Sequence, residues 1–282
     1  MTNTCHREFF YRKDRGKQMI TSTANPRIRQ LIARQEKAKK RREDNCFLAE
    51  GIKMLREAPA EWIREIYLTE EAVSKIQKEE KETFRKIMET GYETVSEEVM
   101  KKASDTQTPQ GVITVLNRPE YHLHSLLQDE NGIYLILENL QDPGNLGTII
   151  RTSEGAGVKG VIMTADTVDI YNPKTIRSTM GSVYRVPFLY VDTLTEAVEA
   201  MKRKKIHLYA AHLKGEKKYY EFDYRGGCAF LIGNEGNGLS REAAELSDDY
   251  LKIPMEGHVE SLNAAIAASI LMYEAFRQRS EK

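Results

Sequence analysis

The sequence predicts an α/β protein made of two bodies, a small mixed α/β module followed by a larger unit with a mostly parallel sheet. Short apolar segments alternate with helical segments along the chain, which is typical of strands connected by crossover helices. A stretch rich in proline, histidine and acidic residues, 118–131, separates two such series. With 282 residues, 40% of them apolar, the chain is long enough for a substantial core in each body.

The first body is predicted to span residues 21–117. Residues 1–20 have no periodic apolar pattern and are expected to form a disordered tail. The predicted elements of the body are a basic helix within Asn25–Arg42, a strand at Cys46–Ala49, a helix at Ile52–Ala58, a strand at Ile63–Thr69, a charged helix at Ala72–Thr90, a short helix from Ser96 and a strand at Gly111–Leu116.

The second body is predicted to span residues 132–282. Its predicted strands are Tyr134–Leu137, Gly160–Met163, Phe188–Val191, His207–Ala211, Ala229–Ile232 and Tyr250–Ile253. Its predicted helices are Asn145–Gly157, Lys174–Val183, Thr193–Lys204 and Ala264–Arg279. Thr193 with Glu196 has the form of a capping box, and Ser261 and Asn263 both offer caps to the last helix. Strands alternating with helices predict a parallel sheet covered on both faces.

The charge is zero overall but is distributed unevenly. Residues 1–44 carry 13 lysines and arginines against 5 acidic residues. The basic side chains of this arm, which we expect to contact RNA phosphates, are Arg27, Arg29, Lys39, Lys40, Arg41 and Arg42. A solvated basic helix face is the alternative interpretation.

Several protein classes do not fit this composition. There is no run of 18 apolar residues to span a membrane and no apolar signal segment near the start, so we expect a cytoplasmic protein. Its three cysteines are far apart and predict neither a disulfide framework nor a zinc site. His207, His212, His258 and the Lys214–Lys218 cluster are interpreted as ordinary loop and surface residues.

Three polar loops follow three of the predicted strands, and in parallel sheets ligands bind at such strand ends. The first contains the turn Asp142-Pro143-Gly144, with Asn145 as an expected helix cap and Arg151 farther along. The second, 233–239, has three glycines but not the spacing of a dinucleotide fingerprint, and no Walker lysine follows. The third, 253–263, joins the last strand to the last helix. Together they predict one site for a small polar ligand.

These loops, in this order, resemble the three motifs of the SpoU/TrmH family of RNA 2′-O-ribose methyltransferases, within the SPOUT superfamily. Tyr171–Ser182 is similar to the interior of that family, and Phe47–Gly51 and Thr108–Gly111 resemble the ends of its N-terminal RNA substrate-binding domain. The resemblance covers nearly all of the chain from Thr21 onward. It implies an α/β-knot domain with a trefoil knot, a ribosomal-protein-like N-terminal domain, and a homodimer formed through the C-terminal domain.

The resemblance also implies roles for particular residues. S-adenosylmethionine would bind at Gly233, Ile253, Met255, Gly257 and Leu262, without a metal ion. The implied catalytic positions are Asn145, Arg151, Glu235, Ser261 and Asn263. We expect Asn145 to orient the ribose hydroxyl and Arg151 to hold a phosphate, because a guanidinium keeps its proton. Arg177 is a further candidate for a phosphate contact.

The substrate and two other classes of function stay open on the sequence. Ribosomal RNA is the first expectation, because of the separate N-terminal domain and its basic arm, and transfer RNA is the second. A non-catalytic RNA-binding protein would keep the arm but would not need the cofactor loops. A dehydrogenase would need the glycine fingerprint with an acidic residue about 20 positions later, and the first loop has neither.

Overall fold

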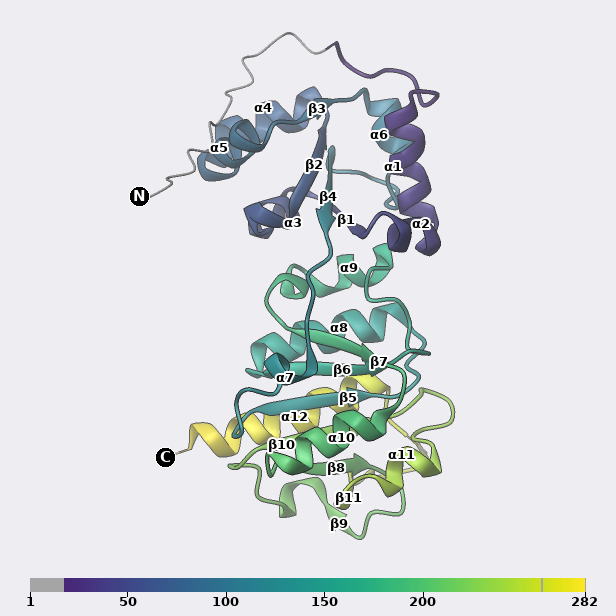
Figure 1. Ribbon diagram of the computed structural model, residues 1–282, viewed down its shortest axis with the longest axis vertical. Coiled ribbons are helices and arrows are strands. Elements are labelled where there is room, and N and C mark those ends of the chain that lie inside the picture. The colour runs from purple at the N-terminus through teal and green to yellow at the C-terminus, as the bar shows by residue number, and fades with distance from the viewer. Residues whose placement is uncertain (1–17, 260, 282) are drawn as a thin grey trace, which may run out of the picture.

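Two α/β bodies are stacked along the long axis of the molecule in the computed structural model, which describes residues 18–259 and 261–281 (Figure 1). Residues 1–17 of the tail expected at 1–20 lie outside the described residues. Ile20 is not part of a free tail, because its backbone N–H donates to the carbonyl of Thr94 at 2.9 Å.

The N-terminal body is built on a four-stranded sheet in the order β1-β4-β2-β3. Its strands are β1 Cys46–Glu50, β2 Ile63–Leu68, β3 Glu93–Thr94 and β4 Val112–Asn117. The period-two pattern of β1 decides its packing, since Cys46 and Leu48 face one apolar cluster and Phe47 and Ala49 face the other. Helices α1 Pro26–Glu36, α2 Ala38–Glu43 and α6 Glu97–Ala103 lie on the first side; α3 Ile52–Glu57, α4 Glu70–Glu79 and α5 Lys81–Thr90 lie on the second (Figure 1).

Three helices predicted as continuous are interrupted. The basic helix breaks at Lys37, which is extended (φ −116°), and the charged helix breaks at Glu80 (φ −134°). The Glu80 carboxylate accepts hydrogen bonds from Arg56 at 2.7 Å and from Thr83 at 3.0 Å, and α5 packs back along α4. The helix predicted to reach Val183 ends at Thr179, because Met180 (φ 53°) and Gly181 (φ 103°) adopt left-handed conformations.

The C-terminal body contains a seven-stranded sheet in which every pairing is parallel, so the predicted sheet type is confirmed. The strand order is β7-β6-β5-β10-β8-β11-β9. The strands are β5 Ile133–Leu137, β6 Gly160–Thr164, β7 Phe188–Val191, β8 His207–Ala211, β9 Lys217–Lys218, β10 Cys228–Ile232 and β11 Asp249–Lys252. The Lys214–Lys218 cluster, interpreted as a surface feature, therefore contributes an edge strand.

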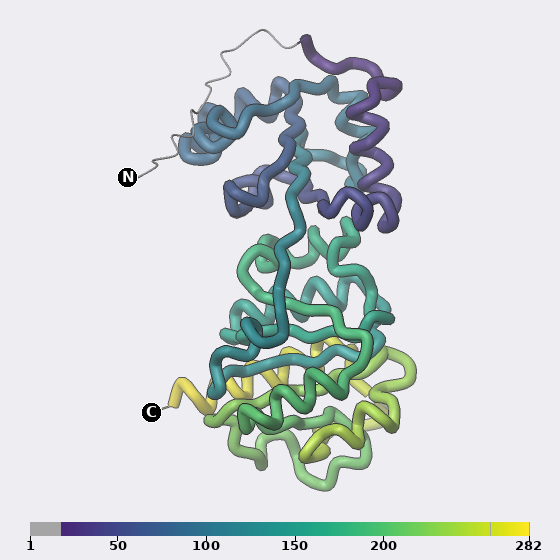
Figure 2. Tube along the Cα trace, viewed as in Figure 1, coloured from purple at the N-terminus to yellow at the C-terminus, as the bar shows by residue number. Residues whose placement is uncertain are grey.

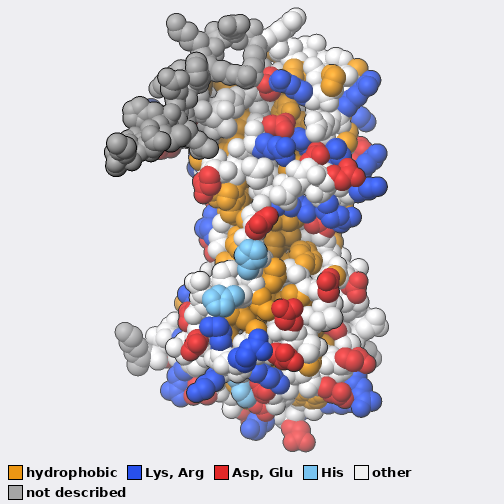
Figure 3. Space-filling model, viewed as in Figure 1, with side chains coloured by type: hydrophobic (Ala, Val, Ile, Leu, Met, Phe, Trp, Pro, Cys, Tyr) orange, Lys and Arg blue, Asp and Glu red, His pale blue; other side chains and the backbone are white. Residues whose placement is uncertain are grey.

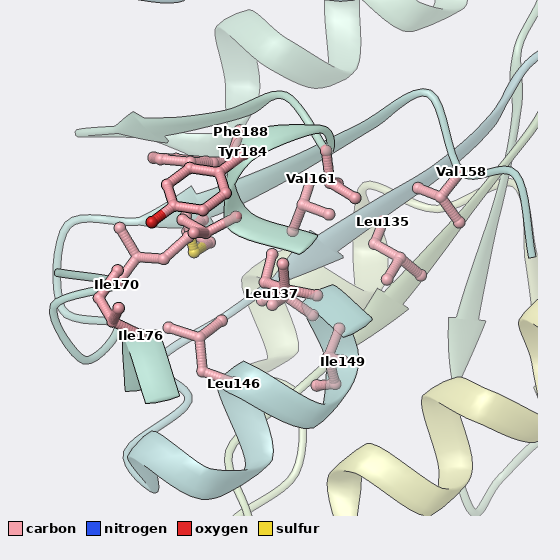
Figure 4. Packing of buried hydrophobic residues seen from close by; sticks show 14 of the residues in the cluster. Leu135, Leu137, Leu146, Ile149, Val158, Val161, Ile170, Ile176, Tyr184 and Phe188 are labelled. Carbon is pink, nitrogen blue, oxygen red and sulfur yellow. The ribbon is translucent and has the colours of Figure 1, made fainter. Parts of the chain in front are cut away.

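Helices cover both faces of this sheet. On one face lie α8 Pro143–Gly155, α9 Pro173–Thr179 and α12 Ala264–Ser280; on the other lie α7 Leu123–Leu126, α10 Leu194–Arg203 and α11 Arg241–Glu245. Strand β5 is buried along its whole length, with Leu135 and Leu137 packed toward Ile149 and Leu146 of α8 (Figure 4). Single 3₁₀ turns occur at Ala60–Trp62, Ser182–Tyr184 and Tyr219–Glu221.

The last helix returns across the sheet to pack on α8 and β10 (Figure 2). Asn263 caps it, accepting from the N–H of Ala265 at 2.9 Å, whereas Ser261 makes no cap bond. Its far end is held by Arg279, which donates to the carbonyls of Tyr224 and Asn131. The capping box predicted at Thr193 is wrong, since that side chain makes no cap bond. The trefoil knot implied by the resemblance stays a prediction.

The two bodies share an apolar contact at the waist of the molecule (Figure 3). Phe47 of β1 packs against Tyr171, with ring centroids 4.9 Å apart, and Trp62 packs edge-on against Tyr184 at 6.1 Å. The linker expected at 118–131 runs past this contact and contains α7. Cys46 and Cys228 are free and buried, and none of the described helices is long and apolar enough to cross a bilayer.

Gly147 of α8 should be intolerant of any side chain. A Cβ added there would lie 2.3 Å from Cβ of Ser178 and 2.8 Å from the carbonyl oxygen of Thr175, because α8 and α9 pack at backbone distance. We expect Gly147→Ala to lower the free energy of unfolding by about 1–3 kcal/mol in urea titrations. Gly155→Ala in the same helix is the control; its added Cβ would meet only the Tyr273 hydroxyl, and we expect equal or slightly higher stability. Equal midpoints for wild type and Gly147→Ala would contradict this account of the helix contact.

Candidate active site

Three loops meet at the edge formed by the carboxyl ends of β5, β10 and β11, as the sequence predicts. Because all the strands run parallel, residues that follow their last positions lie on the same side of the sheet. In Figure 1 this edge lies on the right, where α8, α11 and α12 begin.

The Glu235 carboxylate joins the second loop to the first. Its Oε1 accepts from the backbone N–H of Asp142 and from Nδ2 of Asn145, both at 3.0 Å, and its Oε2 accepts from the N–H of Gln141 at 3.0 Å. Burial alone would raise the pKa of Glu235, but the hydrogen bonds from Asn145, Gln141 and Asp142 outweigh it and hold that pKa below its ordinary value. The carboxylate therefore stays charged.

Asn145 does not cap α8 as predicted. Asp142 is the cap, accepting from the N–H of Asn145 at 2.8 Å, and this leaves the Asn145 side chain free to turn toward Glu235. Its Oδ1 accepts from Nδ2 of Asn263 at 2.8 Å, so both ends of the Asn145 amide are oriented. Asn145, Glu235 and Asn263, one from each loop, thus form a continuous network, which we call the amide–carboxylate network.

Two other predicted catalytic residues lie outside this network. Arg151 follows Asn145 by six positions, about 240° around the helix, so its side chain leaves α8 on a different side. It is exposed and has no hydrogen-bond or ion-pair partner among the described residues. Ser261 is also exposed and makes no hydrogen bond within the described part of the chain.

The predicted cofactor positions fit a ligand that is held by backbone groups. A Cβ added to Gly233 would lie 2.1 Å from the carbonyl carbon of Gly238, so only glycine lets the second loop close on itself. The backbone of 254–259 and 261–262, which includes Met255, Gly257 and Leu262, makes no hydrogen bond to another described residue. Its donors and acceptors remain available at the same edge.

Sequence reasoning missed two contributors to this edge. The loop after β8 lies against the end of β11. The backbone N–H of His212 donates to the carbonyl of Leu251 at 3.0 Å, and Gly215 packs on the Leu251 backbone. The strand-end rule, applied to β8, would have found it. Gln141 supports the first loop, since its Nε2 donates to Oδ1 of Asn139 and to the carbonyl of Asp166. No pattern in the sequence marked that contact.

A cavity of about 420 Å³ opens at the carboxyl ends of β5, β6, β7 and β10. It is not lined by Asn145, Glu235 or Asn263. Its lining does include Asn139 next to the first loop's turn and, from the second loop, Asn234, Asn237, Gly238 and Leu239. Carboxylates dominate its charged lining, which is unfavourable for phosphate groups. These are Glu138, Asp166, Asp192 and Glu242. Among the described residues, no three His, Cys, Asp or Glu side chains gather into a possible metal site.

The basic arm is only partly available to a polyanion. Arg29, Lys39 and Arg42 are exposed and have no partner among the described residues, and Lys101 and Lys102 of α6 add exposed charge beside α1. Arg27 pairs with Glu93, Lys40 with Asp44, and Arg177 with Asp105, all in partly exposed positions.

Arg41, predicted as an RNA contact, is only 3% exposed. It donates to backbone carbonyls of α1 and to Asp169 of the other body, so it cannot meet a phosphate at the surface.

Comparisons with known proteins agree with this architecture. Residues 132–273 match the SpoU rRNA methylase family and residues 25–114 match the MRM3-like substrate binding domain. An uncharacterised tRNA/rRNA methyltransferase of Synechocystis is 34% identical, covering 92% of this chain and 94% of that protein. The 23S rRNA (guanosine(2553)-2′-O)-methyltransferase RlmP of Bacillus subtilis is 33% identical, covering 83% and 90%. The AdoMet-bound rRNA methyltransferase of Sinorhizobium meliloti superimposes with a TM-score of 0.81 at 31% identity, covering 92% and 97%.

Glu235→Gln should destabilise the loops in a pH-dependent way. A glutamine has one acceptor oxygen and turns an NH₂ group toward donors that now meet a carboxylate, so we expect a loss of about 1–3 kcal/mol at pH 7. Because the folded-state pKa of Glu235 is lowered, the stability that it contributes is present above the unfolded pKa and disappears as pH falls through the folded value. Urea titrations at pH 7, 5, 4 and 3 should show the difference between variant and wild type shrinking below about pH 4.5. A difference that is constant with pH would exclude this role.

Proposed function

The chain belongs to the SpoU rRNA methylase family, and from this premise we propose that it transfers a methyl group to a ribose 2′-hydroxyl of RNA. The donor is S-adenosylmethionine, and the protein is an RNA methyltransferase. The observation that carries the proposal is the amide–carboxylate network, because it brings one polar residue from each of the three loops to a single strand edge.

For this reaction the protein mainly has to align the ribose 2′-hydroxyl with the methyl group of the donor and to remove one proton from the hydroxyl. When bound, S-adenosylmethionine supplies a methyl group already activated by its sulfonium sulfur. The backbone of Gly233, Ile253, Met255, Gly257 and Leu262 would hold the donor. Asn145 would orient the hydroxyl, since its Oδ1 gives one lone pair to Asn263 and keeps a second for a hydroxyl donor.

We assign Arg151 to the site of a second copy in a homodimer. Its side of α8 adjoins an exposed apolar stripe on α12 formed by Ile266, Tyr273 and Phe276. The Tyr273 hydroxyl lies 3.0 Å from the position that a Cβ on Gly155 of α8 would occupy, and α12 packs on α8, so the two helices form one surface. An apolar stripe at helical spacing favours burial against another subunit. Arg151 at its border would then hold a phosphate of RNA bound to the partner.

Ribosomal RNA is the proposed substrate, with transfer RNA as the second candidate. The relative RlmP acts on 23S rRNA, and the Synechocystis relative carries both RNA classes in its name. Helices α1 and α2, which carry exposed basic side chains, lie on the same side of the molecule as the strand edge, at the right in Figure 1. An RNA that binds the arm would therefore continue toward the site, in the cytoplasm where both RNA classes work.

Methyl transfer and its division between subunits can be tested together. We expect calorimetry to show S-adenosylmethionine binding, and the protein to add 2′-O-methyl groups to total RNA from a strain that lacks it, at positions found by mapping. Asn145→Ala and Arg151→Ala should each lower kcat by about 100-fold or more, while both keep S-adenosylmethionine affinity. Because a mixed dimer has one intact site, mixing the two variants should restore about a quarter of wild-type activity.

No recovery on mixing would assign Arg151 to its own subunit's site. Wild-type activity in Arg151→Ala would remove it from catalysis. Absence of donor binding would exclude the methyltransferase assignment in favour of an RNA-binding protein.

The arm should contribute through phosphate contacts. Each of Arg29→Ala, Lys39→Ala and Arg42→Ala should reduce the salt dependence of RNA affinity, lowering the slope of log K against log salt by about 0.7–0.9 for each phosphate that is no longer neutralised. Lys78→Ala on α4, across the sheet from α1, is the control and should leave the slope unchanged. Filter-binding at several salt concentrations measures these slopes. Equal slopes for all four variants would mean that the arm is only a solvated surface.

A further inference from the structure

Arg41 connects the basic arm to the other body from inside the molecule. Its Nη1 donates to the carbonyls of Arg34 and Gln35 at 3.1 and 3.2 Å, and its Nη2 donates to Oδ2 of Asp169 at 3.0 Å. The guanidinium is therefore fixed to the last turn of α1 on one side and to the C-terminal body on the other. Its neighbour Arg42, in the same short helix, is exposed.

Asp169 is equally well fixed on its own side. It lies in the loop 165–172 between β6 and α9, and its Oδ1 accepts from the N–H of Tyr171 at 3.0 Å. The Tyr171 ring packs against Phe47 of β1 and carries the guanidinium of Arg118 at 4.3 Å from its centroid. Apolar and cationic groups thus lie beside the carboxylate, and its hydrogen bonds to Tyr171 and Arg41 fix the geometry of the pair.

The same loop supports the active site. Val168 donates to the carbonyl of Leu140 at 2.8 Å, and the carbonyl of Asp166 accepts from Nε2 of Gln141 at 2.8 Å. Gln141 in turn donates its backbone N–H to Glu235. A chain of direct contacts therefore runs from α1 through Arg41, Asp169 and the loop 165–172 to the amide–carboxylate network.

The other ion pairs between the two bodies are more exposed to solvent than the Arg41–Asp169 pair. The side chains of Arg177 and Asp105 are 46% and 40% exposed, and those of Arg185 and Glu57 are 43% and 22% exposed. In the Arg41–Asp169 pair the arginine is only 4% exposed and the aspartate 23%, so it is the cation that is better shielded. Exposed pairs are weak and are screened by salt. Among the described residues, the Arg41–Asp169 pair is the better shielded connection.

We propose that Arg41 and Asp169 are a positioning pair, which fixes the RNA-binding helices α1 and α2 at a set distance from the amide–carboxylate network. The pair touches neither RNA nor methyl donor; it acts by holding bound RNA so that one ribose reaches Asn145. This inference rests on the proposed RNA substrate. It predicts that removing the pair lowers turnover of bound RNA rather than the affinity for RNA, because phosphate contacts on the arm's surface remain.

The adjacent arginines provide a matched test on the full-length protein. We expect Arg41→Met and Asp169→Asn to lower kcat for RNA methylation about 10-fold or more with KM changed less than about threefold, and Arg41→Lys to recover part of kcat. Arg42→Ala should instead raise KM with kcat nearly unchanged. Calorimetry with S-adenosylmethionine on each variant checks that the donor site is intact. If Arg41→Met does not fold, Asp169→Asn and Arg41→Lys decide the question.

A second readout does not depend on methylation. Spin labels on Ser74→Cys and Glu196→Cys, both exposed, report the distance between the bodies in a Cys5→Ser background, since Cys46 and Cys228 are buried. We expect one narrow distance distribution for wild type and Arg42→Ala, and a broadened one for Arg41→Met and Asp169→Asn. Unchanged distances in Arg41→Met, or an Arg41→Met that raises KM as Arg42→Ala does, would overturn the proposal. If the wild-type protein methylates no RNA but Arg41→Met and Asp169→Asn still broaden the distance distribution, the proposed function is wrong and the structural role of the pair remains.

Discussion

The arrangement of the active edge depends on one carboxylate, that of Glu235. An ionised carboxylate can only accept hydrogen bonds, so every group that faces it must be a donor. The backbone N–H groups of Gln141 and Asp142 and the Nδ2 of Asn145 meet that condition. Once the Asn145 nitrogen is committed to Glu235, its oxygen must face Asn263, whose own oxygen caps the last helix. A single charge thus orients two amides and the start of α12.

Much of this architecture could be predicted from local pattern, because it depends on periodicity and on where strands end. The buried strands of the second body read as apolar runs, and the loops that follow β5, β10 and β11 were found as one set. The cap of α8 was wrongly predicted at Asn145, since Asp142 and Asn145 are both good capping residues and only the contact of Asn145 with Glu235, 90 positions away, separates their roles. Arg41 was misassigned for a similar reason, because its partner, Asp169, is 128 residues distant in the sequence. Nothing in the basic segment 37–42 indicates which of its side chains is buried.

The waist of the molecule shows how two separately predictable bodies become one functional unit. Aromatic packing of Phe47 on Tyr171 buries apolar surface there. The Arg41–Asp169 pair sets the relative orientation of the two bodies, because an ion pair with fixed hydrogen bonds tolerates less rotation than an apolar contact. Arg151 represents the opposite case, a side chain with no partner within its described chain. The three residues of the amide–carboxylate network are thus paired within the described chain, whereas Arg151 and the arm residues Arg29, Lys39 and Arg42 are exposed without a partner there.

The order of the strands has a consequence for how the chain is made. Strand β10 pairs with β5 through Leu231 and Ile136, about 95 residues earlier, so the sheet cannot close before the last quarter of the chain exists. At roughly 5–20 residues per second of synthesis, β5 waits on the order of ten seconds for its neighbour. The N-terminal body has all its strands by Asn117 and can fold during that interval. Until β10 arrives, β5 presents an apolar open edge, the feature that most favours aggregation of nascent chains. Incomplete chains that end before Ile232 should therefore be a burden on the chaperones and proteases of the cell.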